Sequence, residues 1–306
     1  MTNRISVVIS AFNEEKNIGD CLQSIKWADE IILVDNTSSD KTVSIAKKYT
    51  SKIFKRPNNR MLNINKNYGF EKATNKWILN LDADERVTEE LKREIINVIN
   101  NNSDDFDGFE IPRKNIIFGK WIRHGIWWPD YQIRLFKKGK GKFECRHVHE
   151  KIKLEGKLGQ LSQPLLHYNY KSISEYIRKF NDIYTENEVE NFLKSGKRIY
   201  WYDAIRMPVN EFLSVFLARS IYKDGLHGLV LSILQAFYAL VTFCKVWERQ
   251  KFWEYNNSKF LNEVKQEINK SFKDYKYWTQ NANLKNLIRK IIGEKIWIKL
   301  RSIKAK

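Results

Sequence analysis

Apolar and polar residues follow one pattern over the first hundred residues and other patterns after that. The first part alternates short apolar runs with segments of helical periodicity. The predicted elements are strands at 5–10, 30–35, 52–55 and 77–81, and helices around 18–25, 43–49, 64–74 and 89–100. Such alternation is typical of a parallel sheet covered by helices on both faces. Thr88 stands where an N-cap belongs, with Glu89 and Glu90 in the first turn of the helix it precedes.

The pattern changes after about residue 105. Short strand-like runs, separated by Gly, Pro and basic turns, lie at 107–113, 131–136, 147–154 and 164–168. They predict an antiparallel addition to the sheet, and from Ser172 onward the chain reads as helical. We therefore expect a catalytic domain at 1–170, with halves of about 1–105 and 106–170, and a helical, basic region at 171–306.

Composition narrows the function. The chain has 306 residues and a formal net charge of +18, with 54 Lys and Arg against 36 Asp and Glu. This excess predicts an anionic partner. The three cysteines, Cys21, Cys145 and Cys244, are scattered without metal-type spacing and are read as free thiols in a reducing compartment. The apolar run at the N-terminus is too short for a signal peptide, so we expect no signal peptide and a cytosolic catalytic part.

Acidic residues follow two of the predicted strands. Asp35 ends the second strand, and Asp82 and Asp84 end the strand in "NKWILNLDADERV". Ligands of open α/β sheets bind beyond the carboxyl ends of the strands, and alternate residues of an extended chain share a side. The acid pair is therefore read as a site for Mg²⁺ or Mn²⁺ on a substrate phosphate, although an isolated pair is usually a solvated turn. No Gly-rich turn follows the first strand, which argues against a nicotinamide fingerprint and a P-loop.

Three segments, taken in order, resemble a known family. "SVVISAFNEEKNIGDCLQSI", "IILVDNTSSDKT" and "NKNYGFEKATNKWILNLDADE" look like the nucleotide-sugar motifs of family 2 glycosyltransferases, which have the GT-A fold. The resemblance covers roughly residues 4–170. It implies a nucleotide-diphospho-sugar transferase with a mixed, mainly parallel sheet and flanking helices, followed here by the helical C-terminal region. "PDYQIRLFKK", "RHVHEKI" and "LLHYNYKSISEYIRKFNDIYTENE" resemble bacterial lipopolysaccharide core β-glucosyltransferases.

The resemblance implies a role for each matching position. Glu150 takes the place of the general base of inverting members; because that motif usually ends in Asp, Asp130 is the alternative. Asp84 is the expected metal ligand, joined by His167 and by Asp82, which contacts ribose or metal-bound water. The expected nucleotide-sugar-binding residues are Ala11, Asn13, Glu14, Asp35, Lys66, Asp82 and Arg134. Lys66 and Arg134 are included because glycosyl transfer develops negative charge on the departing diphosphate, which cations stabilise.

Aromatic and histidine residues are candidates for binding the acceptor. Trp127 and Trp128 precede a proline, which favours a loop platform for sugar rings over core packing. His147 and His149 share one face of a predicted strand, with Glu150 on the other face. They are read as acceptor-binding or supporting residues.

Two C-terminal segments have patterns that indicate binding to a membrane surface. Residues 226–244 are 19 residues without formal charge, and a polar stripe runs along them. An interfacial helix is favoured over a transmembrane span or an ordinary core helix. Residues 284–306 form a basic amphipathic pattern, typical of helices at anionic membranes. We expect a peripheral enzyme on the cytoplasmic face of the bacterial inner membrane.

The predicted activity is inverting transfer of a hexose, with glucose favoured, from a UDP-sugar to a lipid-linked or lipopolysaccharide acceptor. The alternative acceptor is a polyprenyl phosphate, a polysaccharide or a protein. A basic nucleic-acid-binding protein is the alternative of a different class. It explains the charge but not the ordered acids at strand ends, and no nucleic-acid motif is present. We therefore expect no nucleic-acid partner.

Overall fold

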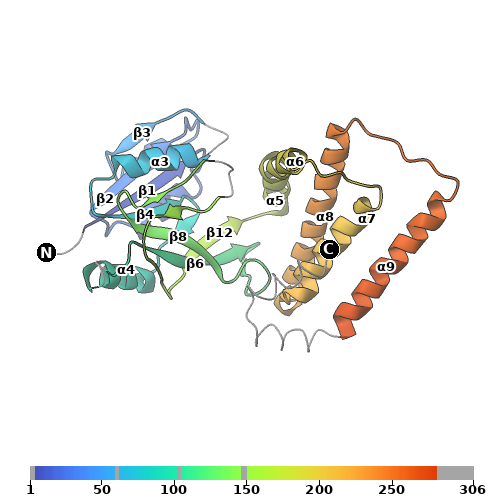
Figure 1. Ribbon diagram of the computed structural model, residues 1–306. Helices are drawn as coiled ribbons and strands as arrows, with labels where there is room; N and C mark the ends of the chain where they lie inside the picture. The colour runs from blue at the N-terminus through green and yellow to red at the C-terminus, as the bar shows by residue number, and fades with distance from the viewer. Residues whose placement is uncertain (1–3, 59–61, 102–104, 146–149, 281–306) are drawn as a thin grey trace. The chain divides into compact units, whose positions relative to one another are not determined.

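The computed structural model describes residues 4–58, 62–101, 105–145 and 150–280. The chain divides into two compact units. The first comprises residues 1–121 and 127–171, and the second comprises 122–126 and 172–306. Figure 1 shows strands and their covering helices in the first unit and helices in the second.

The first unit is built on one large mixed sheet. Its order is β3-β2-β1-β4-β8-β6-β12-β5, with β7 and β11 paired to β6, while β9 and β10 form a separate pair. The strands are β1 (Ile5–Ala11), β2 (Glu30–Asp35), β3 (Ile53–Lys55), β4 (Trp77–Asp82), β5 (Glu85–Arg86), β6 (Gly108–Ile117), β7 (Lys120–Trp121), β8 (Asp130–Lys137), β9 (Gly141–Lys142), β10 (Lys153–Leu154), β11 (Leu158–Gln160) and β12 (Leu165–Tyr170).

Strands β1 to β4 run parallel, and β8 and β5 run antiparallel to their neighbours. The predicted mixed, mainly parallel sheet with flanking helices is confirmed. The predicted strand at 147–154 is wrong in its described part, where only Lys153–Leu154 is extended and pairs with β9. Residues 147–149 lie outside the described residues.

Helices cover both faces of this sheet. The helices of the first unit are α1 (Ile18–Ser24), α2 (Thr42–Ala46), α3 (Leu62–Lys72) and α4 (Glu89–Asn101). Alternate strand residues divide the core: Val7 and Leu79 pack in one cluster, and Val8 and Ile78 in the other. This division follows from the two-residue period of a strand whose two faces are both buried. The predicted cap of α4 is confirmed, because Leu91 N donates to Thr88 Oγ1 at 3.2 Å.

A glycine sets how closely α3 approaches the sheet. A Cβ on Gly69 would lie 2.4 Å from Val8 Cγ1, so a larger side chain would push the helix away. Helix α3 carries Asn63, Asn65 and Lys66 toward the carboxyl ends of the strands. The small residue in its middle therefore fixes the position of polar side chains at its start.

The second unit is helical. Its helices are α5 (Ile173–Lys179), the π-helix η1 (Phe180–Tyr184), α6 (Thr185–Lys194), α7 (Asp203–Leu213), the π-helix η2 (Ser214–Ala218), the 3₁₀-helix η3 (Ile221–Asp224), α8 (Leu226–Arg249) and α9 (Phe260–Gln280). Among the described residues, α8 is the one helix long and apolar enough to cross a bilayer. The short segment 122–126 belongs to this unit, because Arg123 N and His124 Nδ1 both bond to the Asp224 carboxylate, at 3.1 and 3.0 Å.

Candidate active site

Three parallel strands end at one edge of the sheet. Ala11, at the end of β1, is in register with Asp35 of β2, and Ser10 is in register with Asp82 of β4. Two of the acids expected at strand ends therefore flank the end of β1, as the parallel topology requires. Polar side chains and loops meet at this edge, where open α/β sheets bind ligands.

The loops after β1 and β2 are joined by hydrogen bonds. Asn13 N donates to Ser38 Oγ at 3.0 Å, and Asn13 Oδ1 accepts from Ser39 N at 2.8 Å. The buried Asp35 carboxylate accepts from Ser38 N at 3.3 and 3.2 Å. Asn13 adopts a left-handed backbone with φ of 53°, and Asn is one of the few residue types that tolerates this. These bonds hold Asn13 and Asp35 together at the carboxyl edge, and Glu14 N donates to Thr42 Oγ1 of α2 at 2.8 Å.

Buried amides lie beneath these loops, on the side of the sheet covered by α3. Asn65 Nδ2 donates to Asn36 Oδ1 at 2.7 Å, and Asn36 Nδ2 donates to Ser10 Oγ at 3.1 Å. Asn80 is fully buried in β4, and neither of its amide atoms has a hydrogen-bond partner among the described residues. Buried polar groups are normally paired, so Asn80 marks a place for water or for polar atoms of a ligand.

Two cations hold the Asp82 carboxylate. Lys66 Nζ lies 2.5 Å from Oδ1, and Arg134 Nη2 lies 2.6 Å from Oδ2. Burial alone would raise the pKa of Asp82, but the charges of Arg134 and Lys66 outweigh it and hold that pKa well below its ordinary value. The three residues predicted for the nucleotide sugar thus form one cluster. Arg134 Nε is buried without a partner among the described residues, which leaves a donor in the cluster.

Glu85 completes the cluster from below. It is fully buried, accepts from Asp82 N at 2.9 Å, and lies 2.5 Å from Arg134 Nη2 and 3.6 Å from Arg113 Nη1. Burial would lower the pKa of Arg134, but the two carboxylates outweigh it and raise that pKa. A buried charge needs such partners. Glu85 therefore supports the acid pair and does not lie on a solvated turn.

Asp84 meets His167 of β12. His167 Nε2 lies 3.6 Å from Asp84 Oδ2, and His167 Nδ1 lies 2.6 Å from Asn115 Oδ1. The Asn115 amide is oriented by its other end, because Nδ2 donates to the carbonyl oxygen of the buried Trp127 at 2.7 Å. Asn115 Oδ1 must then accept a hydrogen bond from His167 Nδ1–H. The Nε2 lone pair is left facing Asp84, as in metal-binding histidines anchored by a second residue.

These two residues fit a divalent cation held partly by a substrate. Carboxylate oxygen and imidazole nitrogen are ligands that Mn²⁺ accepts, and Mg²⁺ is commonly bound by one or two carboxylates plus phosphates. Over the described ranges, no cluster of three or more His, Cys, Asp or Glu side chains is placed to hold a metal. Asp82 faces Lys66 and Arg134 instead. The remaining ligands would come from a diphosphate and water.

Helix α3 also reaches the candidate base. Glu150 Oε1 accepts from Asn63 Nδ2 at 3.1 Å and from Cys145 N at 2.6 Å. Asn63 precedes Lys66 by three residues, and side chains at that spacing are neighbours on one helix face. The helix that holds Asp82 through Lys66 therefore also holds Glu150 through Asn63.

The alternative base, Asp130, is engaged by a cation. Its Oδ2 accepts from Arg113 Nε at 2.9 Å and Nη2 at 2.5 Å, and Gln132 Nε2 donates to Oδ1 at 2.7 Å. Burial would raise the pKa of Asp130, but the Arg113 charge and these hydrogen bonds lower it. A carboxylate with a lowered pKa is a weaker base, so the geometry favours Glu150 for this role.

The candidate acceptor residues are only partly described. Trp127 is buried, whereas Trp128 is half-buried and packs edge-on against Trp121, with ring centroids 5.2 Å apart. Trp128 is thus the residue of the pair with a ring surface available to a sugar. His147 and His149 lie outside the described residues.

Comparison with known proteins identifies a family and several similar proteins. Residues 6–153 match the model of the family described as Glycosyl transferase family 2. The chain is 29% identical over 251 residues to the lipopolysaccharide core biosynthesis glycosyltransferase LpsC of Rhizobium meliloti (strain 1021), a match that covers 80% of this chain and 92% of LpsC. Over residues 6–153, the chain has the sequence of a glycosyl transferase family 2 domain. It is thus a nucleotide-sugar glycosyltransferase.

Another curated protein and two solved structures are also similar to this chain. The glycosyltransferase RT0209 of Rickettsia typhi is 29% identical over 257 residues, covering 80% of this chain and 87% of RT0209. Among solved structures, the Pyrobaculum calidifontis mannosyltransferase PcManGT, in complex with GDP-Man and Mn²⁺, has a TM-score of 0.44 and 14% identity, covering 95% of this chain and 88% of PcManGT. S. aureus TarS 1–349 has a TM-score of 0.41 and 14% identity, covering 83% and 93%.

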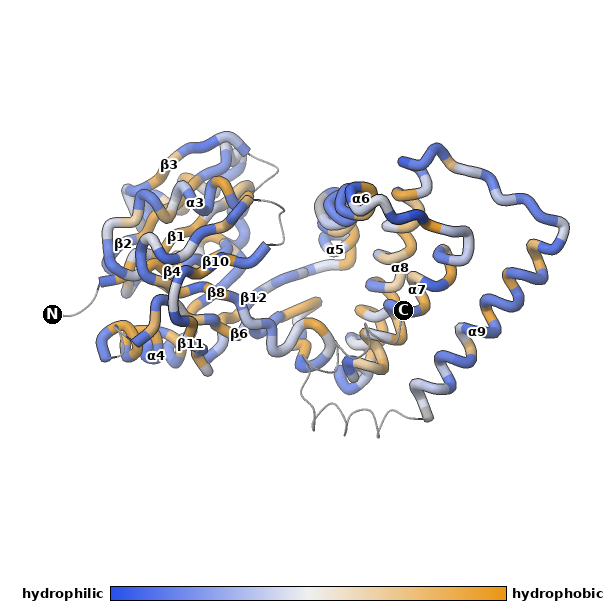
Figure 2. Tube along the Cα trace, in the orientation of Figure 1, coloured by the Kyte–Doolittle hydropathy of each residue, from blue (hydrophilic) through white to orange (hydrophobic). Residues whose placement is uncertain are grey.

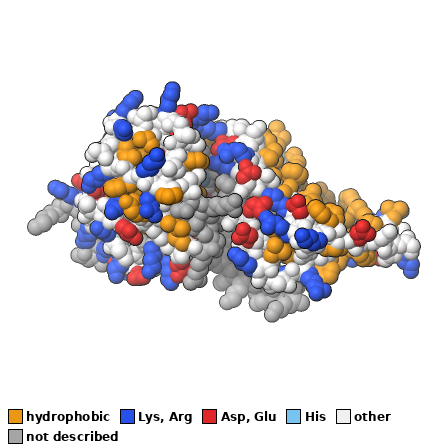
Figure 3. Space-filling model, turned by 90° about the horizontal axis from the view of Figure 1, so that it is seen from above, with side chains coloured by type: hydrophobic (Ala, Val, Ile, Leu, Met, Phe, Trp, Pro, Cys, Tyr) orange, Lys and Arg blue, Asp and Glu red, His pale blue; other side chains and the backbone are white. Residues whose placement is uncertain are grey.

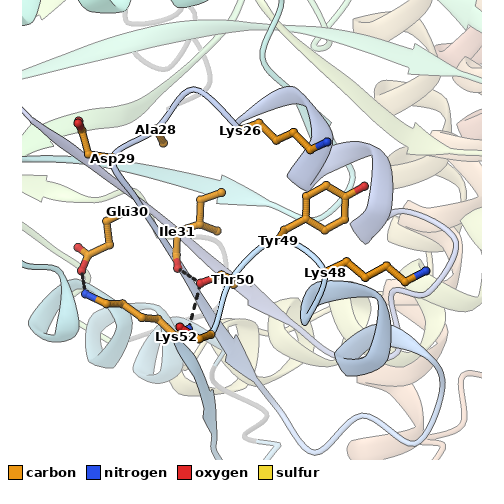
Figure 4. Close-up of a pocket in the computed structure, with 10 residues that line it drawn as sticks. Lys26, Ala28, Asp29, Glu30, Ile31, Lys48, Tyr49, Thr50 and Lys52 are labelled. Carbon is orange, nitrogen blue, oxygen red and sulfur yellow. Dashed lines mark hydrogen bonds and ion pairs between the residues drawn. The ribbon is translucent and has the colours of Figure 1, made fainter.

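A pocket of about 420 Å³ in this glycosyltransferase lies at the opposite end of β2 (Figure 4). Lys26, Lys48 and Tyr49 line one side, and Glu30 pairs with Lys52 on the other. Glu30 starts β2, whereas Asp35 ends it, so this pocket is not part of the candidate site at the carboxyl edge.

Four residues of the site were missed by the sequence reasoning: Asn63, Glu85, Arg113 and Asn115. Arg113 and Asn115 are alternate residues of β6 and so share one side of the strand. Polar residues in the strand "GFEIPRKNII" were the available signal. Their partners, Asp130 and His167, are 17 and 52 residues away in the chain, which local patterns do not reveal.

Proposed function

We propose that this family 2 glycosyltransferase is an inverting, metal-dependent hexosyltransferase that acts on a membrane-bound glycolipid acceptor. UDP-glucose is the favoured donor, and lipopolysaccharide core is the favoured acceptor. The name of LpsC and the resemblance of three segments to core β-glucosyltransferases support the acceptor class. The proposed location is the cytoplasmic face of the bacterial inner membrane, where a cytosolic donor and a lipid-linked acceptor meet.

One observation carries the proposed chemistry. Asp82 with its two cations, the Asp84–His167 pair and Glu150 all lie in the first unit, and α3 contacts both Asp82 and Glu150. Inversion by one displacement needs a base for the acceptor hydroxyl and positive charge for the departing diphosphate. These side chains supply both functions.

The reaction then follows from the residues. Glu150 accepts the proton of the acceptor hydroxyl, whose oxygen forms a bond to the anomeric carbon as the bond to the diphosphate oxygen breaks. Arg134 and Lys66 bring positive charge to the donor side. A divalent cation, when bound by Asp84 and His167, would neutralise part of the diphosphate charge. Asn63 holds the Glu150 carboxylate, and Asn115 holds His167.

The test is a panel of nucleotide sugars offered with two acceptors, a lipopolysaccharide core acceptor and a polyprenyl phosphate. We expect metal-dependent transfer from a UDP-hexose to the core acceptor, with the product anomer inverted when read by NMR. If sugar is transferred only to the polyprenyl phosphate, then the proposed lipopolysaccharide core acceptor is wrong and polyprenyl phosphate takes its place. Retention of configuration, or equal rates with and without a chelator, would refute the mechanism.

A further inference from the structure

From residue 226 to residue 244, every exposed side chain of helix α8 is apolar. The exposed positions between residues 226 and 244 are Leu226, Leu229, Ile233, Phe237 and Cys244. Leu226 is 72% exposed, Ile233 53% and Phe237 45%. The spacings of three, four, four and seven residues place these side chains on one face of the helix. Figure 2 shows the apolar colouring along α8.

The polar side chains of α8 face the protein instead. Gln235 Nε2 donates to the Tyr176 hydroxyl of α5 at 2.9 Å, and Lys245 Nζ lies 2.8 Å from Glu186 of α6. Ser232 and Thr242 are buried. The polar stripe predicted from the sequence is therefore on the packed face. A surface helix in water shows the reverse arrangement, with apolar residues inside and polar residues outside.

Charged residues lie only at the two ends of this uncharged run. Lys223 and the buried Asp224 precede it, and Lys245, Glu248 and Arg249 follow it. Lys223 is exposed, and a long basic side chain at such a position can place its amine in a headgroup layer while its stem covers apolar surface. Lys245 and Arg249 are instead paired with Glu186 of α6. The outward face of α8 is therefore apolar and uncharged from Leu226 to Cys244, as expected for a helix in contact with lipid.

Helix α9 shows a second exposed apolar row. Leu261, Ile268, Phe272 and Tyr275 are exposed, at 66%, 41%, 61% and 48%. Lysines accompany them along the helix, and residues 251–306 carry 14 Lys and Arg against 5 Asp and Glu. Figure 3 shows hydrophobic side chains gathered on part of the helical unit. Contiguous exposed apolar surface of this kind marks an interaction site, and the basic excess favours an anionic partner.

We propose that the outward face of α8 inserts into the acyl-chain region of one bilayer leaflet, with the helix lying along the membrane. Helices α5 and α6 bond to its other face, so protein covers one side of α8 and lipid covers the other. This proposal rests on the proposed function, because that function supplies the membrane-bound substrate. It adds hydrophobic insertion to the electrostatic attachment expected from the basic residues. Vesicle binding needs no sugar transfer, so either proposal can fail alone.

The experiment compares three full-length proteins on vesicles. The double variant Ile233→Glu/Phe237→Glu charges the outward face, and Leu158→Glu charges a matched exposed position of β11, where Leu158 is 44% exposed. Binding is measured by flotation on zwitterionic phosphatidylcholine vesicles in about 1 M salt, where the Debye length is about 3 Å. We expect the wild type and Leu158→Glu to float, and the double variant to lose at least about tenfold in partition, because two charges then enter the acyl region.

A second measurement does not depend on the double variant folding. Ile233→Cys and Leu158→Cys, each in a protein in which Cys145 and the exposed Cys244 are replaced by alanine, are labelled with an environment-sensitive fluorophore and mixed with vesicles of brominated phosphatidylcholine. Quenching at position 233 but not at 158 is expected. Release of the wild type by high salt, or absence of quenching at 233, would overturn insertion. If the label at 233 is shielded in vesicle-free protein, the face is covered by protein and not by lipid. Light scattering then identifies the cover: a dimer would assign it to a second copy, and a monomer would assign it to residues 281–306.

Discussion

Replacing Asn115 by alanine tests whether this residue orients His167 for metal binding. In the structure, Asn115 Oδ1 accepts from His167 Nδ1 at 2.6 Å, and the buried imidazole presents Nε2 to Asp84. The alanine variant removes that acceptor. The ring is then free to rotate or to carry its proton on Nε2, where it would block the lone pair.

The expected loss follows from comparable anchoring residues. Removing a group that orients a metal-binding histidine typically weakens metal affinity about 10- to 100-fold, which is about 1.4–2.8 kcal/mol. The variant also leaves the Trp127 carbonyl without the Asn115 donor at 2.7 Å, and an unsatisfied buried group costs about 1–3 kcal/mol of stability. Metal binding must therefore be measured well below the melting temperature.

The assay is the affinity for Mn²⁺ in the presence of UDP, followed by electron paramagnetic resonance of the free ion. Nitrogen-15 NMR of the imidazole reports its tautomer. Gln132→Ala is the matched control, because Gln132 donates to Asp130 at 2.7 Å, and no bond joins it to His167 among the bonds described. The reasoning is refuted if folded Asn115→Ala binds Mn²⁺ as tightly as the wild type, or if His167 keeps its tautomer without Asn115.

Four further changes have defined outcomes. Asp84→Ala should abolish Mn²⁺-dependent sugar transfer with little change in melting temperature; activity within a few-fold of the wild type would remove Asp84 from the metal site. Glu150→Gln should lower transfer by ~10²–10⁴-fold while calorimetry shows intact UDP binding; lost UDP binding would place Glu150 in the nucleotide site instead. Burial of Glu30 is outweighed by hydrogen bonds from Lys52, Ser6 and Thr74, which lower its pKa from 4.5 to about 2. Its stabilising effect is thus complete above pH 4.5 and lost as pH falls toward 2, so acid unfolding of Glu30→Gln should be less steep over that window. Deleting residues 284–306, with eight Lys and Arg at ~1 kcal/mol each near an anionic leaflet, should weaken flotation on anionic vesicles at low salt; equal flotation would exclude that segment as an anchor.

The sheet was predictable because its signal is local. Apolar runs such as "ISVVIS", "EIILVD" and "WILNLD" are buried on both faces, and each is bounded by polar turns. The acid pair was recognisable for the same reason, since it directly follows a strand. Helix α2 was predicted too long, at 43–49 against the observed Thr42–Ala46, because the sequence gives little indication of where a short helix ends.

The supporting residues were not predictable because their partners are distant in the chain. Glu85 reads as one of three adjacent acids, yet it is fully buried because Arg134 and Arg113 arrive from β8 and β6. The polar stripe of α8 was visible in the sequence. The sequence did not show whether this stripe faces protein or the outside, because periodicity identifies the faces of a helix but not which face packs against protein.

Residues 122–126 fold with the helical unit, and this limits how hybrid enzymes can be made from this chain and a relative. Arg123 and His124 bond to Asp224, and Gly125 N donates to the Arg219 carbonyl at 3.1 Å, so this short segment folds with helices that follow it by about a hundred residues. A hybrid that joins the first 171 residues to the helices of a relative would separate Asp224 from its partners. Exchange of the helical unit between relatives therefore requires residues 122–126 to be exchanged together with the helices.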